Sequence, residues 1–241
     1  MSQKNSSVKN KIPNFYINKL KDKKINKIYK EFEKSLNIKE NFVVAVSGGA
    51  DSLALAFLSK IYAIKNGLVT KFFIVDHKLR AESTKEARLV KQVLRKHSIN
   101  SEILKWEGKK PRKNIQSLAR DKRYELLFNK CSKLKIKNIL LGHHIDDLFE
   151  NFFIRILRGS GLKGLTSLNQ KSKFGNINLH RPLLGQKKED LIFISNNIFN
   201  FYIKDPSNND EKFLRIRVRH LISELQRNGL DKKKLNNTIK N

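Results

Sequence analysis

The sequence predicts an α/β fold in which helices cover both faces of a parallel sheet, with a short helical extension at the C-terminal end. Three observations predict it: short apolar runs alternate with helical patterns, a glycine turn follows the first run, and polar motifs follow later ones. Such alternation is typical of βαβ units. The 241 residues suit one large domain with small additions. We predict a basic leader over residues 1–38, helical or partly disordered, a main domain over 39–205, and a basic helical extension and tail over 206–241.

The first predicted elements are a leader helix and a buried strand. We expect an amphipathic helix within residues 19–36, packed on the domain edge or partly disordered. Four of its apolar residues recur at helical spacing: Ile25, Ile28, Tyr29 and Phe32. Residues 42–46 form a continuous apolar run, which is the pattern of a strand buried on both faces.

The later elements follow in alternation. Further strands are expected at residues 72–75, 102–106 and 139–141. Helices are expected at residues 53–64, 83–96, 115–134, 146–157, 187–196 and 211–227. Residues 174–178 are expected to form a hairpin loop, and the polar tail from Asp231 is expected to fray.

Polar motifs follow three of the predicted strands. They are residues 47–52, Asp76 with His77, and residues 143–150. Ligands of open parallel sheets bind at the carboxyl ends of the strands. We therefore expect these motifs to meet in one binding site.

The charge of the chain favours a nucleic-acid partner. Fifty-one Lys and Arg residues oppose 22 Asp and Glu residues, for a formal net charge of +29. A field of this sign attracts polyanions. A general compositional bias towards Lys, Asn and Ile is the alternative source of part of this excess.

Composition also predicts where the protein works. No apolar run approaches the roughly 18 residues of a membrane span, and the first ten residues lack the apolar core of a signal peptide. We therefore expect a cytoplasmic protein with no membrane partner. The single cysteine, Cys131, has no partner for an internal disulfide. The oligomeric state stays open, with a homodimer as one option.

The motif SGGADS joins the first strand to the following helix. Its glycines allow the backbone to approach a ligand closely, and the helix start offers free N–H groups and a positive dipole end to an anion. It differs from the common phosphate loop because it has no lysine. A carboxylate beside phosphates is explained by a bridging Mg²⁺. The phosphate-binding candidates are Ser47, Gly48, Gly49, Ala50, Asp51 and Ser52.

The motif HHIDDLFE at residues 143–150 places acids at a helix start. Asp146 or Asp147 can cap that helix, and Asp146 and Glu150 share a helical face because they lie four residues apart. Clustered carboxylates near phosphates can hold Mg²⁺ or bind a cationic amine. Zinc is the rival metal for the histidines and aspartates, and a capped helix start with solvated acids is the structural alternative.

These motifs together resemble the tRNA(Ile)-lysidine synthetases of the PP-loop ATP pyrophosphatase superfamily, with its adenine nucleotide α-hydrolase-like fold. SGGxDS indicates the superfamily, whereas the later motifs indicate the family. The resemblance runs from about residue 42 to 225 through SGGADSLAL (47–55), VDHKLR (75–80), ARDKRY (119–124), HHIDDLFEN (143–151), RGSGLKGL (158–165), RPLL (181–184), DPSN (205–208) and FLRIRVRH (213–220).

The resemblance implies a two-step ligation. The C2 oxygen of the wobble cytidine of tRNA(Ile) with a CAU anticodon attacks the α-phosphate of ATP and releases diphosphate. The ε-amine of free L-lysine then displaces AMP, which gives lysidine. On this reading residues 39–205 are the ATP-binding catalytic domain.

Roles for individual residues follow as hypotheses. The catalytic candidates are Asp51, Asp76, Asp147 and Glu150, of which Asp51 and Asp147 are the Mg²⁺ candidates. The lysine-binding candidates are Asp76, His77, Asp146 and Glu150. Arg120 and Arg158 are candidates for binding phosphate or tRNA, with an exposed helix charge as the alternative. Arg215, Arg217 and Arg219 are candidates for binding tRNA, with a solvated helix as the alternative. His144 is a further substrate-binding candidate. The arginines at 215, 217 and 219 do not all share one helical face, which argues against a one-sided clamp on RNA.

Departures from the family pattern and rival functions complete the prediction. Gln116, Asn151 and Ile216 replace the Glu, Thr and Asn that the family usually has, so a metal or lysine role at 116 is in doubt. The chain is also shorter than many relatives, as a minimal enzyme or a fragment would be.

Three rival functions are considered. A PP-loop tRNA thiolase typically uses paired cysteines, and an amidating synthetase needs an ammonia source. The third rival is a non-catalytic RNA-binding protein.

Overall fold

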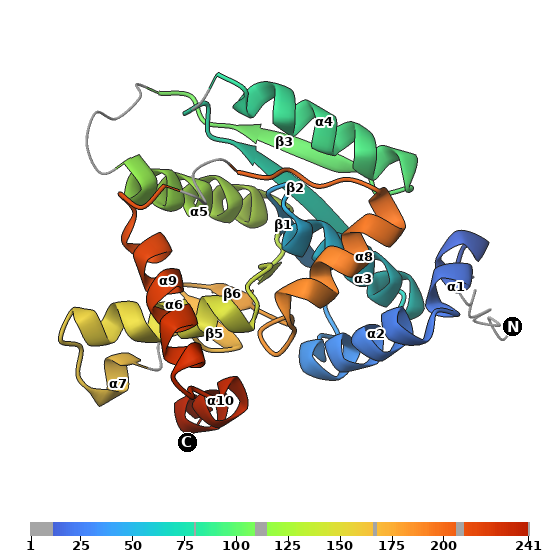
Figure 1. Cartoon of the computed structure of the whole chain (residues 1–241). Coiled ribbons are helices and arrows are strands. Elements are labelled where there is room, and N and C mark those ends of the chain that lie inside the picture. Colours follow the sequence, from blue (N-terminus) through green and yellow to red (C-terminus); the bar gives the residue numbers. More distant parts are fainter. Residues whose placement is uncertain (1–11, 80, 109–114, 166–167, 206–209, 241) are drawn as a thin grey trace, which may run out of the picture.

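The computed structural model describes residues 12–79, 81–108, 115–165, 168–205 and 210–240. Within these residues six strands form one sheet, in the order β3-β2-β1-β4-β6-β5 (Figure 1). The strands are β1 (Phe42–Val46), β2 (Thr70–Asp76), β3 (Ser101–Lys105), β4 (Asn138–Leu140), β5 (Lys171–Phe174) and β6 (Ile177–His180). Neighbouring strands pair in parallel except β5, which is antiparallel to β6. The predicted parallel sheet and the hairpin near residue 175 are confirmed.

Helices lie on both faces of this sheet (Figure 1). They are α1 (Asn14–Leu20), α2 (Lys23–Leu36), α3 (Ala50–Lys65), α4 (Ser83–Lys96), α5 (Ile115–Leu134), α6 (Ile145–Leu157), α7 (Leu162–Leu165), α8 (Lys188–Phe199), α9 (Leu214–Arg227) and α10 (Lys232–Lys240). The predicted helices agree with α3, α4, α5, α6, α8 and α9 to within a few residues.

The strand β1 is buried on both faces, which accounts for the continuous apolar run of residues 42–46. Successive side chains of a strand point to opposite faces. Phe42, Val44 and Val46 of β1 therefore join the core formed with α2, α3, α4 and α8. Val43 joins a second core, in which Leu127 and Cys131 of α5 pack against the other face. Both faces of β1 are thus covered, as in other parallel sheets.

The described part of the leader is built into the first core. The helix expected within residues 19–36 is confirmed as α2, and α1 precedes it. Asp22 caps α2 by accepting hydrogen bonds from the N–H groups of Lys24 (2.8 Å) and Ile25 (2.9 Å). The apolar residues of α2 are buried as their spacing predicted, and Phe32 is fully buried. The division of the chain into three parts stays a prediction.

The tail was expected to fray from Asp231, and that expectation is wrong. Asp231 instead caps α10 by accepting from the N–H groups of Lys233 and Lys234. Leu235 and Ile239 of α10 are buried in a third core. That core also holds Leu148 and Phe149 of α6 and Val218 and Ile222 of α9. Leu235 and Ile239 are the only apolar residues of α10. Two apolar residues in a polar segment are too few for the sequence pattern to predict a packed helix.

The turn between β1 and α3 is enclosed by neighbouring elements. Gly48 has a φ of +92°, which favours glycine, and its carbonyl accepts from the N–H of Ile203 at 2.9 Å. A Cβ atom at Gly48 would lie 2.5 Å from Val90 Cγ2 and 2.8 Å from Ile203 Cδ1. The hydroxyl of Ser195 in α8 donates to the Ala50 carbonyl at 2.7 Å. The first glycine of the motif, Gly48, is therefore required by its backbone angle and by the two neighbouring side chains.

We predict that Gly48→Ala lowers the free energy of unfolding more than Gly175→Ala does. Gly175 also has a positive φ, of +55°, but a Cβ there would meet nothing within 4 Å. Strain alone costs about 1–2 kcal/mol, and the added contacts at Gly48 cost roughly 1–3 kcal/mol more. Urea unfolding of the two variants measures the difference, and equal losses would contradict the packing argument.

A second prediction concerns His180, at the end of β6. Its Nε2 lies 3.0 Å from the Asn138 side-chain oxygen, and burial lowers its pKa to about 4. In the unfolded chain the pKa is about 6.5, so between these values the unfolded chain binds more protons. The histidine's contribution to stability is therefore complete above pH 6.5 and is lost as the pH falls towards 4. His180→Asn removes this dependence. Urea unfolding at several pH values should show a stability difference that varies between pH 4 and 6.5, and a constant difference would refute the assignment.

Candidate functional site

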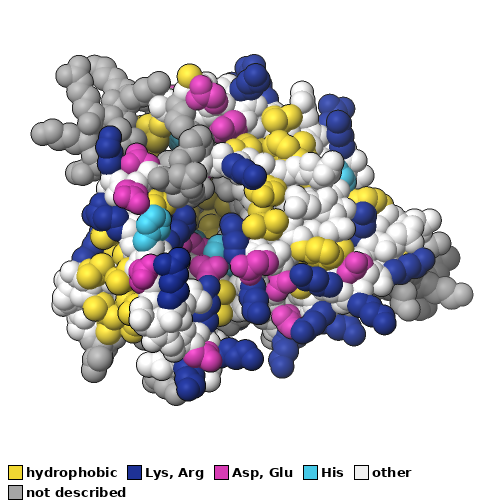
Figure 2. All heavy atoms as spheres, in the orientation of Figure 1, with side chains coloured by type: hydrophobic (Ala, Val, Ile, Leu, Met, Phe, Trp, Pro, Cys, Tyr) yellow, Lys and Arg dark blue, Asp and Glu magenta, His cyan; other side chains and the backbone are white. Residues whose placement is uncertain are grey.

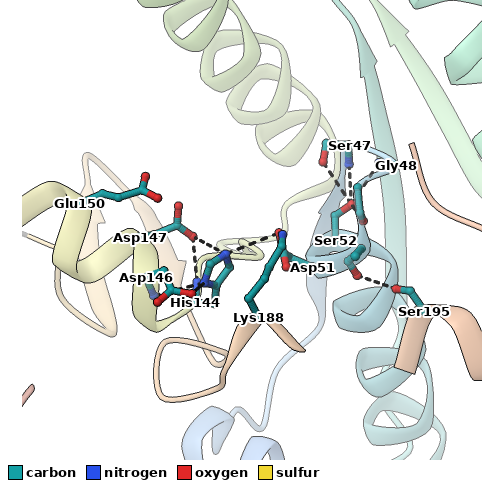
Figure 3. A network of polar contacts seen from close by, with 12 residues as sticks. Ser47, Gly48, Asp51, Ser52, His144, Asp146, Asp147, Glu150, Lys188 and Ser195 are labelled. Carbon is teal, nitrogen blue, oxygen red and sulfur yellow. Dashed lines mark hydrogen bonds and ion pairs between the residues drawn. The ribbon is translucent and has the colours of Figure 1, made fainter. Parts of the chain in front are cut away.

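The turn after β1 is held in shape by one hydroxyl group. Ser52 Oγ accepts from the N–H groups of Ser47 (3.1 Å) and Gly48 (3.0 Å) and donates to the Gly49 carbonyl (2.9 Å) (Figure 3). The N-cap residue of α3, Gly49, makes no side-chain capping bond. The start of α3 is therefore open to an anion, where the helix dipole and first-turn N–H groups favour negative charge. The predicted nucleotide motif has the required local structure.

Asp51 projects from the first turn of α3. Its Oδ2 lies 2.5 Å from Lys188 Nζ, at the start of α8, and 3.8 Å from His144 Nε2 (Figure 3). Its Oδ1 is buried and has no hydrogen-bond partner among the described residues. One carboxylate oxygen is therefore paired with a cation while the other is left for a ligand.

The second motif forms the start of α6 and faces Asp51. His144 is the N-cap: its Nδ1 accepts from the N–H of Asp146 (3.2 Å), and its own N–H donates to Asp147 Oδ2 (3.0 Å). With Nδ1 as the acceptor, the proton of the neutral ring is on Nε2. That atom lies 3.6 Å from Asp147 Oδ2 and 3.8 Å from Asp51 Oδ2. The imidazole thus stands between the two carboxylates that were predicted to act together.

The charge state of Asp147 follows from this arrangement. Its burial alone would raise the pKa, but His144, His143 and the N–H of His144 outweigh that effect and hold the pKa of Asp147 below its usual value. Desolvation lowers the pKa of His143 to about 4, so His143 is neutral near pH 7. Asp147 is therefore an ionised carboxylate available to a cation.

Glu150 lies one turn further along α6 and is deeply buried. Arg219 Nε of α9 lies 2.5 Å from Glu150 Oε1, and Arg215 Nε lies 3.4 Å from Oε2. Burial raises the pKa of Glu150 even though Arg219 opposes that rise. Glu150 therefore joins α6 to α9 as a buried ion pair, while Asp146 is paired with Lys232 Nζ of α10 at 2.9 Å.

Asp76 and His77 form their own hydrogen-bonded turn at the end of β2. Asp76 Oδ1 accepts from the N–H of Lys78 (3.1 Å), and Oδ2 accepts from Thr84 Oγ1 (2.7 Å). His77 Nδ1 accepts from the N–H of Leu79 (3.2 Å). Both Asp76 oxygens are thus engaged in connecting β2 to α4. The proposed role of Asp76 in lysine binding stays a prediction, and this geometry adds no support to it.

The predicted arginines are divided among several environments. Arg215 and Arg219 turn towards Glu150, whereas Arg217 is exposed and donates to the carbonyls of residues 211 and 212. This confirms that the three do not share one face. Arg120 lies over the ring of Tyr124, 5.8 Å from its centroid, and Arg158 is exposed at the end of α6. Figure 2 shows acidic and histidine side chains near the middle of one face with Lys and Arg around them.

Sequence reasoning missed three cations at this site. Lys188 and Lys232 contact the acids directly, yet in a chain with 51 Lys and Arg residues no local signal distinguished them. Arg181 of the RPLL motif was quoted without a role. It is buried and donates to the Asn169 carbonyl (2.8 Å) and to Ser172 Oγ (2.9 Å), so it ties the end of β6 to the segment leading into β5.

Comparison with known proteins places these features in a family. The family model for the PP-loop domain matches residues 18–225. A tRNA(Ile)-lysidine synthase of Orientia tsutsugamushi is 43% identical over 183 residues, which are 76% of this chain and 41% of the relative. The tRNA(Ile)-lysidine synthase of Rhodopseudomonas palustris is 37% identical over 195 residues, 80% of this chain and 56% of the relative. The chain thus spans about half the length of the curated relatives it matches.

Structural similarity agrees on the fold. A U34-tRNA thiolase from Methanococcus maripaludis superposes with a TM-score of 0.72 at 18% identity, over 88% of this chain and 76% of the thiolase. No helix among the described residues has the length and apolar character needed to cross a bilayer. The sheet order, the glycine turn after its central strand and the match over residues 18–225 lead to one conclusion: this chain belongs to the PP-loop domain family.

Proposed function

We propose that this chain uses ATP to join free L-lysine to C2 of the wobble cytidine of tRNA(Ile) with a CAU anticodon, forming lysidine, AMP and diphosphate. The observation that carries the proposal is the meeting of Asp51, at an open helix start, with His144 and Asp147 of the second motif. The relatives named as tRNA(Ile)-lysidine synthases support it over 76–80% of this chain. With ATP and tRNA as its substrates, the protein would act in the cytoplasm.

The turn after β1 is the proposed cradle for the ATP phosphates. Backbone N–H groups at the start of α3 are preorganised because Ser52 fixes the turn before any ligand arrives. Asp51 and Asp147 would hold Mg²⁺, since carboxylate oxygens are its preferred ligands and Asp51 Oδ1 is buried without a partner among the described residues. When bound, Mg²⁺ offsets the negative charge that builds on the phosphates.

The acids at the start of α6 are the proposed site for the lysine substrate. Asp146 already pairs with the ammonium group of Lys232, which supports an alkylammonium site at this carboxylate. The substrate amine has a pKa near 10.4 in solution, so it must lose a proton before it attacks. We propose that a carboxylate or histidine beside the amine takes this proton.

A thiolase function is disfavoured by the cysteine of this chain. Cys131 is the one cysteine in the sequence, and it is fully buried between the sheet and α5. Burial raises the pKa of its thiol to about 12. A thiol in this environment is a poor nucleophile, so the similarity to the archaeal thiolase extends to the fold and not to that chemistry.

We predict that the protein incorporates labelled lysine into a CAU-anticodon tRNA(Ile) transcript with release of one AMP per lysine. The same transcript with uridine at the wobble position serves as the control and should accept no lysine. Thin-layer separation of nucleotides and scintillation counting of the RNA measure both products. Binding of tRNA without AMP would indicate an RNA-binding protein instead, and ADP as the product would refute attack at the α-phosphate.

We also predict that Asp51→Asn lowers the ligation rate about 100-fold or more, because the site loses the charged carboxylate proposed to hold Mg²⁺ beside the phosphates. Binding of tRNA, measured by filter retention, should stay within about twofold of the unmodified protein. Asp190→Asn is the matched control. Asp190 Oδ1 lies 2.9 Å from Lys24 Nζ, so it is paired with a residue outside the turn. Loss of tRNA binding in proportion to activity would contradict the division of roles.

A further inference from the structure

Lys188 is paired with Asp51 in the first turn of α3, directly after the glycine turn. It is the first residue of α8, and its Nζ lies 2.5 Å from Asp51 Oδ2 (Figure 3). The position of α8 is fixed by the Ser195 hydroxyl on the Ala50 carbonyl (2.7 Å). The segment after α8 is fixed by the N–H of Ile203 on the Gly48 carbonyl (2.9 Å). The contacts that shape the turn therefore also place Lys188.

The pair between Lys188 and Asp51 is able to exchange its partners. Lys188 keeps 37% of its side chain exposed and Asp51 keeps 21%. Ion pairs that water reaches in this way contribute only about 0–1 kcal/mol. A lysine ammonium on a flexible four-carbon stem can move several ångströms at little cost, so the pair does not fix Lys188 in place.

Binding of a nucleotide at the turn would change the charges around the Lys188 ammonium group. A triphosphate at the start of α3 brings several negative charges beside Asp51, and a carboxylate next to phosphates repels them unless a cation intervenes. Asp51 Oδ1 is already without a partner among the described residues. A divalent cation on Asp51 would displace the ammonium group, which then has phosphate oxygens within the reach of its own side chain.

We propose that Lys188 is a phosphate-binding residue that occupies Asp51 in the free protein and moves to the β- and γ-phosphates when Mg²⁺ and ATP bind. The ligand class is a nucleoside triphosphate or its diphosphate leaving group. This inference rests on the proposed function, because it requires ATP at the turn. The exchange keeps every charge paired in both states: lysine with carboxylate before binding, and lysine with phosphate after it.

Isothermal titration with no tRNA or free lysine present tests the proposal. Mg²⁺ with ATP, Mg²⁺ with inorganic diphosphate, and AMP are titrated into the unmodified protein and into K188M, K188R and K187M. Lys187 is the matched control because it carries the same charge one residue away and is exposed. We expect K188M to bind ATP and diphosphate about tenfold more weakly or worse, since hydrogen bonds to charged groups are lost. AMP binding to K188M should stay within about twofold, K187M should match the unmodified protein, and K188R should recover most of the loss.

The alternatives give different results. If Lys188 only blocks Asp51, K188M binds Mg²⁺ with ATP as tightly as the unmodified protein or more tightly, and the proposal is overturned. Equal losses in K188M and K187M would assign the effect to overall charge and also overturn it. K188Q provides the same comparison if K188M does not fold. If the unmodified protein binds no ATP, the proposed function itself fails; if only the K188M effect is missing, this inference alone fails.

Discussion

Asp51 stands at the positive end of α3 and still holds a lysine on one of its oxygens. The same pairing recurs around the site: Asp146 holds Lys232, and Glu150 holds Arg219. In a chain with more than twice as many basic as acidic residues, these acids are concentrated where three separate helices supply cations. Each of these acids is therefore paired with a cation from within the chain itself.

Gly142 and Gly48 allow the backbone to pass close to neighbouring elements, and this brings the acids of the two motifs together. A Cβ at Gly142, directly before the second motif, would lie 3.3 Å from backbone atoms of Asp51 and Ser52. The end of β4 thus abuts the first turn of α3, which places His144 between Asp51 and Asp147. Gly48 has the corresponding role on the other side, where Val90 and Ile203 leave no room for a side chain. The two motifs meet because the residues beside them are small.

The sequence was most informative where a pattern reflects local physics. A continuous apolar run such as residues 42–46 marks a strand covered on both faces, and the polar motifs after the strands meet because parallel strands end at the same edge. Lys188 and Lys232 were missed because one lysine among many has no local signature, and their partners come from 137 and 86 residues away. The packing of α10 was missed because Leu235 and Ile239 find their apolar neighbours only in α6 and α9.

The free-energy cost of separating each of these ion pairs depends on how far its side chains are exposed to water. Lys188 and Lys232 are 37% and 39% exposed, so releasing either costs on the order of 1 kcal/mol or less. Glu150 is different, since 3% of its side chain is exposed and leaving it without a cation would cost roughly 3–5 kcal/mol. Any cation that leaves Glu150 must therefore be replaced as it goes. An ammonium group can make that replacement whereas a neutral amine cannot, so this buried acid favours a cationic group over a neutral one.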